Sequence, residues 1–234
     1  KVPIVNAKMY REGSAQDIKD FIYLFGMALK EFGFVIIEGH DIPRNLIKNS
    51  YKIIQDFFAL SLEKKLKYVD STGWGQRGYI SFGKEKAKNS SVMDLKEFWH
   101  VGREFFVHEE TKYKYPKNIW PDNDVQNFKT SLLDLYQWLD DLSKDLLTAL
   151  SQFLNLPKYT LPKMVIDGNS VLRALHYPPL TDTQNLSGAL RAAAHEDINL
   201  LTILCEATES GLQILTRDGD WIDVESGENQ MVVD

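Results

Sequence analysis

A histidine and an aspartate stand two residues apart at the entrance to an apolar run, in the stretch RAAAHEDINLLTIL. If this stretch is a β-strand, the side chains of His195 and Asp197 point to the same face, because side chains alternate along a strand. An imidazole nitrogen and a carboxylate oxygen can then bind the same metal ion. This pair supplies part of a 2-His-1-carboxylate facial triad, the ligand set of many non-haem iron(II) sites. The third ligand has to come from elsewhere.

The spacing by itself is a weak signal. A structural hydrogen bond between a histidine and an aspartate at a strand edge gives the same pattern. A rival pair with the same spacing, His108 and Glu110, lies in FFVHEETKYKYP, which is typical of a polar loop edge. On spacing alone, the metal site and the structural hydrogen bond are both open.

The composition is that of a folded protein without a strongly basic surface. The chain has 234 residues, of which 44% are hydrophobic and 12% aromatic, enough for one large domain or two small ones. The formal net charge is −6 and the isoelectric point is about 5.4. These values argue against a nucleic-acid partner, because such a binder needs a basic face. We interpret the local cluster of Lys84, Lys86 and Lys88 as a solvated loop.

Three features bear on the compartment. Cys205 is the only cysteine, so no disulfide forms within the chain, which favours a reducing environment. No uninterrupted apolar stretch is long enough to span a membrane, and KVPIVNAKMY does not have the architecture of a signal peptide. We therefore expect a cytoplasmic protein with no membrane partner.

Apolar residues in the first two thirds of the chain recur with the period of amphipathic helices. Ser14 and Asp17 form the capping sequence of a helix that we expect to end near Gly33. A second helix is expected to begin at Pro43, and a long one to cover about 124–154. The predicted strands of this part are residues 2–7, 34–37 and 98–101, and the glycine- and aromatic-rich stretch 71–83 is predicted to be a loop.

After Ser170 the pattern becomes that of β-strands. Apolar and polar-tipped residues alternate in SVLRALHYPP, and RDGD is a tight turn between the two halves of a hairpin. The further predicted strands lie in HEDINLLTILCE, GLQILTRDGDWIDV and QMVVD. Helices followed by clustered strands predict an α+β protein with a β-sandwich or barrel core in its C-terminal part.

These segments resemble, in order, the isopenicillin N synthase-like branch of the non-haem Fe(II), 2-oxoglutarate-dependent dioxygenases. The segments are VPIVNA, EFGFVIIEGHDIP, RGYISFGKEKA with DLKEFWHVGRE, LRALHYPP, HEDINLLTIL and GLQILTRDGDWIDV. They are similar to the family's N-terminal strand, its GFF-x-V-x-NHGI segment, its Gly-Tyr loop with an Asp-x-Lys-Glu strand, and its R-x-x-x-YPP, H-x-D-x-x-x-LT-x-L and GLQV…DG-x-W-x-x-V motifs. One match would mean little, whereas six in the family's order over nearly the whole chain indicate membership.

The resemblance implies a single domain with a distorted double-stranded β-helix, or jelly-roll, core flanked by N-terminal helices. Residues 1–165 would form the helical and strand region that packs on the core, and residues 166–234 the first part of the core. In the family, the stretch after ENQMVVD supplies the distal histidine ligand and an Arg-x-Ser that binds the far carboxylate of 2-oxoglutarate. We therefore expect a chain that is truncated before its last core strands.

The resemblance also implies roles for individual residues. His195 and Asp197 would be the first two iron ligands, and Tyr177 matches the tyrosine that hydrogen-bonds a carboxylate of the cosubstrate or substrate. Arg173 can pair with a carboxylate of the cofactor bidentately, or be a structural arginine on the outer face. Leu175 stands where many plant members have a ligand-contacting asparagine, so that contact is not expected here.

The glycine-rich loop offers further candidates. Arg77 and Tyr79 are candidates to touch the prime substrate, although a solvated arginine is the common role of such a loop residue. Trp74, Tyr79 and Phe82 form an aromatic group that can help exclude water. His176 neighbours Tyr177 on the opposite strand face, so we expect it to point away from the site.

The implied chemistry uses Fe(II), O2 and 2-oxoglutarate as cosubstrate, with ascorbate as an aid that keeps the iron reduced. A small organic substrate would be hydroxylated or oxidised while 2-oxoglutarate is converted to succinate and CO2. Such a cofactor carries the difficult chemistry, and the protein supplies geometry and excludes water.

Other functions stay open at this point. One is an iron oxidase of the isopenicillin N synthase type, which uses no 2-oxo acid. Another is a binding or scaffold module without a complete iron site, built on the long helix at 124–154. The truncation itself has three explanations, namely a fragment of a longer enzyme, completion by a second chain through strand exchange, or a degenerate natural protein.

Overall fold

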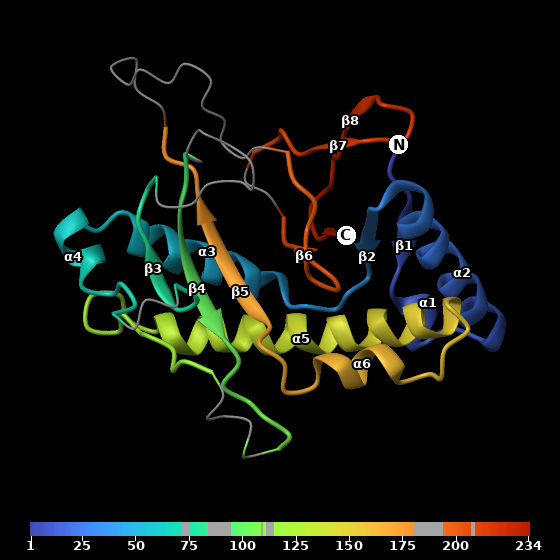
Figure 1. Cartoon of the computed structure of the whole chain (residues 1–234), viewed down its shortest axis with the longest axis horizontal. Coiled ribbons are helices and arrows are strands. Elements are labelled where there is room, and N and C mark those ends of the chain that lie inside the picture. The colour runs from blue at the N-terminus through green and yellow to red at the C-terminus, as the bar shows by residue number, and fades with distance from the viewer. Residues whose placement is uncertain (72–74, 84–94, 109, 111–114, 180–193, 207–208) are drawn as a thin grey trace. The chain divides into compact units, whose positions relative to one another are not determined.

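The computed structural model describes residues 1–71, 75–83, 95–108, 110, 115–179, 194–206 and 209–234 (Figure 1). The helices are α1 (Lys8–Arg11), α2 (Ala15–Phe32), α3 (Arg44–Phe58), α4 (Leu62–Leu66), α5 (Phe128–Phe153) and α6 (Thr160–Val165). The strands are β1 (Ile4–Asn6), β2 (Val35–Glu38), β3 (Gly78–Ile80), β4 (Glu97–Gly102), β5 (Val171–His176), β6 (Ile203–Leu204), β7 (Gln213–Leu215), β8 (Trp221–Asp223) and β9 (Met231–Val233). The predicted loop residues Trp74, Lys84, Lys86 and Lys88 lie outside the described residues.

The described chain divides into two compact units made of interleaved segments. Unit 1 consists of Lys1–Arg44, Trp138–Met164 and Asp197–Asp234, and unit 2 of Asn45–Gln137 and Val165–Glu196. The expected regions 1–165 and 166–234 therefore each contribute to both units.

Unit 1 contains a four-stranded sheet in the order β1-β2-β9-β6. β1 and β2 are parallel, and β9 pairs antiparallel with both β2 and β6. The hairpin β7–β8 forms a separate two-stranded ladder, as RDGD predicts. The core cluster of this unit draws apolar side chains from several elements, namely Val2, Ile36, Ile214, Val224 and Val232.

Helix α2 of unit 1 begins and ends where its sequence predicts. The Ser14 hydroxyl accepts a hydrogen bond from the Asp17 amide at 3.2 Å, and the Asp17 carboxylate accepts one from the Ser14 amide at 2.8 Å. This capping box satisfies two amides that the first turn leaves without helical partners. The helix stops at Gly33, whose left-handed backbone has a φ of 73°, a conformation that glycine adopts without steric cost.

Unit 2 contains the sheet β3-β4-β5, in which all pairs are antiparallel (Figure 1). Its core is built around Phe57 of α3. The Phe57 ring lies 4.6 Å from the Trp99 ring of β4 and 5.6 Å from the Phe128 ring of α5, measured between centroids. Aromatic pairs at such distances add to the stability gained by burial. One face of β4 is thereby fixed against two helices.

Some elements differ from the prediction. β3 lies inside the stretch expected to be a loop, because its ladder with β4 depends on residues distant in sequence. Helix α5 begins at Phe128 and not near Asp124, since Asn127 has a left-handed φ of 61° that no helix can contain. Helices α1, α4 and α6 are too short to give a clear periodic signal. Among the helices described, none combines the length and the apolar character needed to cross a membrane.

Helix packing in unit 1 leaves no room for a side chain at Gly26. A Cβ built on Gly26 would lie 2.1 Å from Cγ of Phe153. We expect Gly26→Ala to lower the free energy of unfolding by about 1–2 kcal/mol, because overpacking outweighs the better helix propensity of alanine. Chemical denaturation measures this loss. In a Phe153→Ala background, which removes Cγ and both Cδ atoms, Gly26→Ala should be nearly neutral, and an equal loss in both backgrounds would contradict the packing explanation.

Candidate active site

The segment that carries His195 and Asp197 is exposed and has no regular secondary structure. The strand expected from His195 onward begins only at Ile203. This correction follows from the partner strand, because among the described residues the ladder to β9 starts at Thr202, whose amide donates to the Asp234 carbonyl at 2.8 Å. Strand alternation therefore does not fix the relative direction of the two side chains.

A chain of hydrogen bonds orients the Asp197 carboxylate. The Thr202 hydroxyl donates to Oδ2 of Asp197 at 2.5 Å, and the Asn199 amide nitrogen donates to the Thr202 hydroxyl at 2.7 Å. Such bonds are typical of the groups that surround metal-ligating carboxylates. The polar residues after Asp197 thus hold the carboxylate from its own segment.

The donor chemistry of this segment suits iron(II). Imidazole nitrogen and carboxylate oxygen are the ligand types of the facial triad, and both side chains are exposed. His195 belongs to unit 2 and Asp197 to unit 1. Within the part of the chain that the structure describes, no three His, Cys, Asp or Glu side chains form a group that could hold a metal. The described residues therefore offer two of the three expected ligands.

The central strand of unit 2 has two chemically different faces. Trp99 faces the core, whereas His100 lies on the other face, directly opposite Arg173 of β5. Residues opposite each other in an antiparallel pair share a face, so the opposed pair Phe98 and Leu175 lies there too. We call the face formed by Phe98, His100, Arg173 and Leu175 the arginine face.

Two neighbours on β4 hold the exposed Arg173 side chain. Its Nε donates to Nε2 of His100 at 2.8 Å, and its guanidinium carbon lies 4.7 Å from the centre of the Phe98 ring. Because a guanidinium only donates hydrogen bonds, His100 accepts through Nε2 and carries its proton on Nδ1. That nitrogen lies 3.1 Å from the Gly75 carbonyl oxygen. His100 is thereby a neutral acceptor in a fixed orientation.

The two residues that end this strand segment lie in different surroundings. His176 is on the core face, where its Nδ1 lies 2.8 Å from Oε1 of Glu97 and its ring stacks on Phe58 at 5.0 Å. His176 therefore lies on the opposite side of the sheet from the arginine face, and its orientation relative to the proposed metal site stays a prediction. Tyr177 follows β5 directly and is half-buried. It lies two residues after Leu175 and four residues after Arg173.

A buried charge network lies beneath the core face of β4. Glu97 accepts hydrogen bonds from the Lys65 ammonium at 2.8 and 3.0 Å and from the Tyr79 hydroxyl at 2.5 Å. Burial would raise the pKa of Glu97, but the bonds from Lys65, Tyr79 and His176 outweigh it and hold the pKa below its ordinary value. Burial and the Glu97 carboxylate together raise the pKa of Tyr79. Glu97 is thus an ionised carboxylate whose partners come from α4, β3 and β5.

The two loop residues proposed to touch the substrate lie in the interior of unit 2. Arg77 is 1% exposed, and its guanidinium donates to the Pro116 carbonyl at 3.1 Å and to the Asn169 side chain at 2.8 Å. Tyr79 is 0% exposed and donates to Glu97. Burial corrects the alternative of a solvated loop arginine for Arg77, and both side chains tie loops and strands together; their contact with the prime substrate stays a prediction.

The rival pair His108 and Glu110 is not arranged as a metal site. Nδ1 of His108 lies 2.7 Å from Oδ2 of Asp167, and Asp167 also accepts the backbone amides of Val107 and His108 at 2.5 and 2.7 Å. Asp167 is buried, so this cluster fastens one loop of unit 2 to another.

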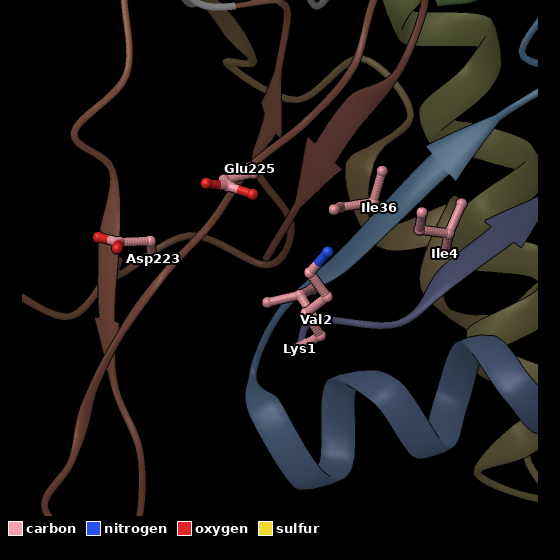
Figure 2. A pocket seen from close by; sticks show the side chains of 6 residues that line it. All are labelled: Lys1, Val2, Ile4, Ile36, Asp223 and Glu225. Carbon is pink, nitrogen blue, oxygen red and sulfur yellow. The ribbon is translucent and has the colours of Figure 1, made fainter.

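A small pocket lies in unit 1 (Figure 2), with a volume of about 60 Å³. It is lined by Lys1, Val2, Ile4, Ile36, Asp223 and Glu225. Small-molecule sites usually measure about 300–1,000 Å³, and none of the predicted site residues lines this pocket. It is therefore not the candidate active site.

Two family models match the chain. Residues 2–123 match the N-terminal domain described as that of a non-haem dioxygenase in morphine synthesis, and residues 168–234 match the 2OG-Fe(II) oxygenase superfamily. A crystal structure of a 2OG-Fe(II) oxygenase family protein from Caulobacter crescentus superimposes with a TM-score of 0.83 at 36% sequence identity, covering 98% of this chain and 72% of that one. The chain belongs to the non-haem Fe(II)/2-oxoglutarate-dependent oxygenases.

Other members of the family are more distant or longer. The proline hydroxylase buaE of Petromyces alliaceus is 30% identical over 212 residues, which is 87% of this chain and 64% of the relative. A full-length Neurospora crassa protein, solved in complex with alpha-KG, has a TM-score of 0.83 at 24% identity, over 99% of this chain and 72% of that one, and shows the shared fold. The chain spans less than two thirds of the length of the first two curated relatives.

His100 and Phe98 of this family member were not singled out by their sequence. The sequence signal that could have found them is the alternation in EFWHVG. Trp99 and Val101 are core residues, so Phe98 and His100 fall on the other face. Only the register of β4 against β5 shows that this face meets Arg173.

The Glu97 network makes the stability of unit 2 depend on pH. A carboxylate whose folded pKa is depressed stabilises the fold above its unfolded pKa, and this contribution is lost as the pH falls through the folded pKa. We expect the free energy of unfolding to decrease as the pH is lowered below about 4.5. Glu97→Gln should be less stable than the wild type at pH 7, and its free energy of unfolding should decrease less steeply at acidic pH, which is the acid limb of the profile. Urea denaturation at several pH values measures both. Glu63→Gln, at an exposed site on α4, is the matched control, and an unchanged acid limb in Glu97→Gln would contradict the role of this carboxylate.

Proposed function

We propose that the protein is an oxidoreductase that uses Fe(II), O2 and 2-oxoglutarate to hydroxylate or oxidise a small organic molecule, with release of succinate and CO2. The observation that carries this proposal is the exposed His195 and Asp197 pair, with its oriented carboxylate, in a chain of this oxygenase family. A relative from Emericella nidulans is named a 2-oxoglutarate-Fe(II) type oxidoreductase, and the Neurospora crassa structure was solved with alpha-KG. Both support the choice of cosubstrate.

His195 and Asp197 would hold the iron, and the third ligand would come from residues outside the described part. The bound iron and 2-oxoglutarate supply the oxidising chemistry. The chain's own contribution is binding and orientation, in which the Tyr177 hydroxyl donates a hydrogen bond to a carboxylate and Arg173 supplies a positive charge. These two residues lie within one short segment that consists of β5 and the residue after it.

We also propose that the strands of this chain belong to a jelly-roll core. The similarity to longer oxygenases over nearly all of this chain supports this. In this proposal the distal histidine and the arginine for the far carboxylate of 2-oxoglutarate belong to the part of the relatives' length that this chain does not span.

An anaerobic titration tests the proposed function. Fe(II) and 2-oxoglutarate added to the full-length protein should give a visible metal-to-ligand charge-transfer band, because the 2-oxo acid chelates the metal. His195→Ala should abolish the band, since one of the ligands is lost. His108→Ala is the matched control, because His108 bonds to Asp167, and it should leave the band unchanged.

The other outcomes separate the competing functions. Tight Fe(II) binding without a band would indicate an oxidase that uses no 2-oxo acid. No Fe(II) binding would reject the iron enzyme and favour a binding or scaffold module.

The hydrogen bond to Asp197 should also affect metal affinity. Thr202→Val keeps the shape of the side chain but removes the hydroxyl that donates to the carboxylate. We expect Fe(II) to bind about 10-fold more weakly, at the low end for loss of such an outer partner. Competition with a chelator measures this change. Thr216→Val is the control, and equal affinities in the Thr202→Val variant and the wild type would show that the bond does not orient the ligand.

A further inference from the structure

The turn between β2 and α3, residues 39–43, is the last part of unit 1 before the chain enters unit 2 at Asn45. Its backbone is unusual, because Gly39 and Asp41 both have left-handed φ values, of 65° and 60°. This conformation costs glycine nothing but is less favourable for aspartate, and it persists where the surroundings hold it. The turn therefore depends on the contacts made by the residue between the two, His40.

The His40 side chain bonds to its own turn. The residue is 0% exposed, and its Nδ1 accepts a hydrogen bond from the Ile42 amide at 3.1 Å. A bond from a side chain to the amide two residues later is the contact that closes an Asx-turn when asparagine or aspartate makes it. The Arg11 guanidinium of α1 holds the same residue from outside the turn, because it donates to the His40 carbonyl at 2.9 Å.

The bond from Ile42 determines the protonation state of the imidazole. Because an amide donates to Nδ1 of His40, that nitrogen carries no proton, and the neutral ring carries its proton on Nε2. Nε2 is buried and has no hydrogen-bond partner among the described residues. A buried donor without an acceptor contributes no stability, so the ring holds the turn through Nδ1 alone.

A second proton on the ring removes the bond to Ile42. The proton binds at Nδ1, toward which the Ile42 amide already points, so that two donors then face each other. The imidazolium is also a charge without water around it, which is costly in a protein interior. Burial accordingly lowers the pKa of His40 below its ordinary value, and the nearby Asn229 backbone offsets this only in part.

The charged groups around the ring do not outweigh its burial. They are Asp41 on the turn itself, Glu206 after β6 and Arg11 of α1. The two carboxylates favour the charged ring, whereas the Arg11 guanidinium disfavours it. The Asp41 carboxylate is in addition shared with cations, since it lies 3.3 Å from the Lys8 ammonium and 3.7 Å from the Arg11 guanidinium. The neutral ring is therefore the form that the folded turn accommodates.

We propose that His40 is a pH-sensitive switch, in which the neutral ring holds the turn 39–43 and protonation at Nδ1 releases it. The switch does not depend on the proposed iron chemistry, because none of its groups is a candidate metal ligand. Release would loosen the segment through which the chain passes from unit 1 into unit 2.

The sign of the pH dependence follows from the lowered pKa. A base that is harder to protonate in the folded state stabilises that state fully above its unfolded pKa, and this contribution is lost as the pH falls toward the folded pKa. The turn should therefore be most stable above about pH 6.5, the ordinary pKa of histidine. Below that value, the equilibrium constant for opening of the turn should rise by up to about 10-fold per pH unit.

Hydrogen exchange of the Ile42 amide in the full-length protein measures this opening. Protection factors are followed by NMR between about pH 5 and 8, the range in which histidine titrates. The Ile18 amide is the internal reference, because it donates to the Ser14 carbonyl in the first turn of α2 and has no contact with the switch. We expect Ile42 to lose protection below about pH 6.5, whereas Ile18 keeps its protection.

His40→Asn separates the imidazole from other titrating groups. Asparagine offers the Ile42 amide an acceptor in an Asx-turn but has no proton to gain in this pH range. The protection of Ile42 should therefore become independent of pH in this variant. His108→Asn removes a histidine of unit 2 that bonds to Asp167, and it should respond to pH as the wild type does.

The wild-type ring gives a second readout that needs no variant. The NMR signals of the His40 ring should titrate below the ordinary histidine pKa and together with the loss of Ile42 protection. An equal pH response in His40→Asn and the wild type would overturn the switch, since the proton would then act on another group such as Asp41 or Glu206. A His40 ring that titrates while Ile42 stays protected would overturn it as well.

Discussion

The buried Glu97 carboxylate is the interaction on which unit 2 depends. An ionised carboxylate in a protein interior is tolerated only when charges and hydrogen bonds replace its water. Glu97 receives them from Lys65, Tyr79 and His176, which lie on α4, β3 and β5. Four elements must therefore meet at one point for the fold to form. The sheet β3-β4-β5 gains a unique register in this way, since a slip of one residue would turn Glu97 away from all three partners.

The same register determines what the other face of the sheet can do. Because side chains alternate, fixing Glu97 and Trp99 toward the core places Phe98 and His100 on the arginine face. His100 then lies opposite Arg173, and a single strand both stabilises the unit and holds the arginine side chain. The aromatic cluster around Phe57 packs on the core face, so the residues that pack the core and those that contact Arg173 lie on different faces of the strand. The effect of a substitution on one face of β4 can then be interpreted separately from the effect of a substitution on the other face.

Local signals predicted the elements whose causes are local. The capping box of Ser14 and Asp17, the left-handed Gly33 and the turn in RDGD each act within a few residues, and all three elements have the predicted form. Tertiary partners decided the rest. The start of β6 depends on β9, and the burial of Arg77 depends on Pro116 and Asn169. Glycine-rich composition indicated a loop near Arg77, but it could not show that the loop folds its arginine inward.

The candidate site residues lie on two kinds of segment with different physical roles. Arg173 is held by hydrogen bonds, a ring contact and the β4–β5 ladder, so its geometry exists before any ligand binds. His195 and Asp197 lie on an exposed segment without regular structure, where a bound metal would itself impose much of the geometry. Regular structure begins at Thr202, where the ladder with β9 starts. The hydrogen bond from the Thr202 hydroxyl to Asp197 therefore links the exposed segment to the sheet. The position of Arg173 is therefore set by the fold, whereas the proposed metal centre would be assembled only together with the metal and its third ligand.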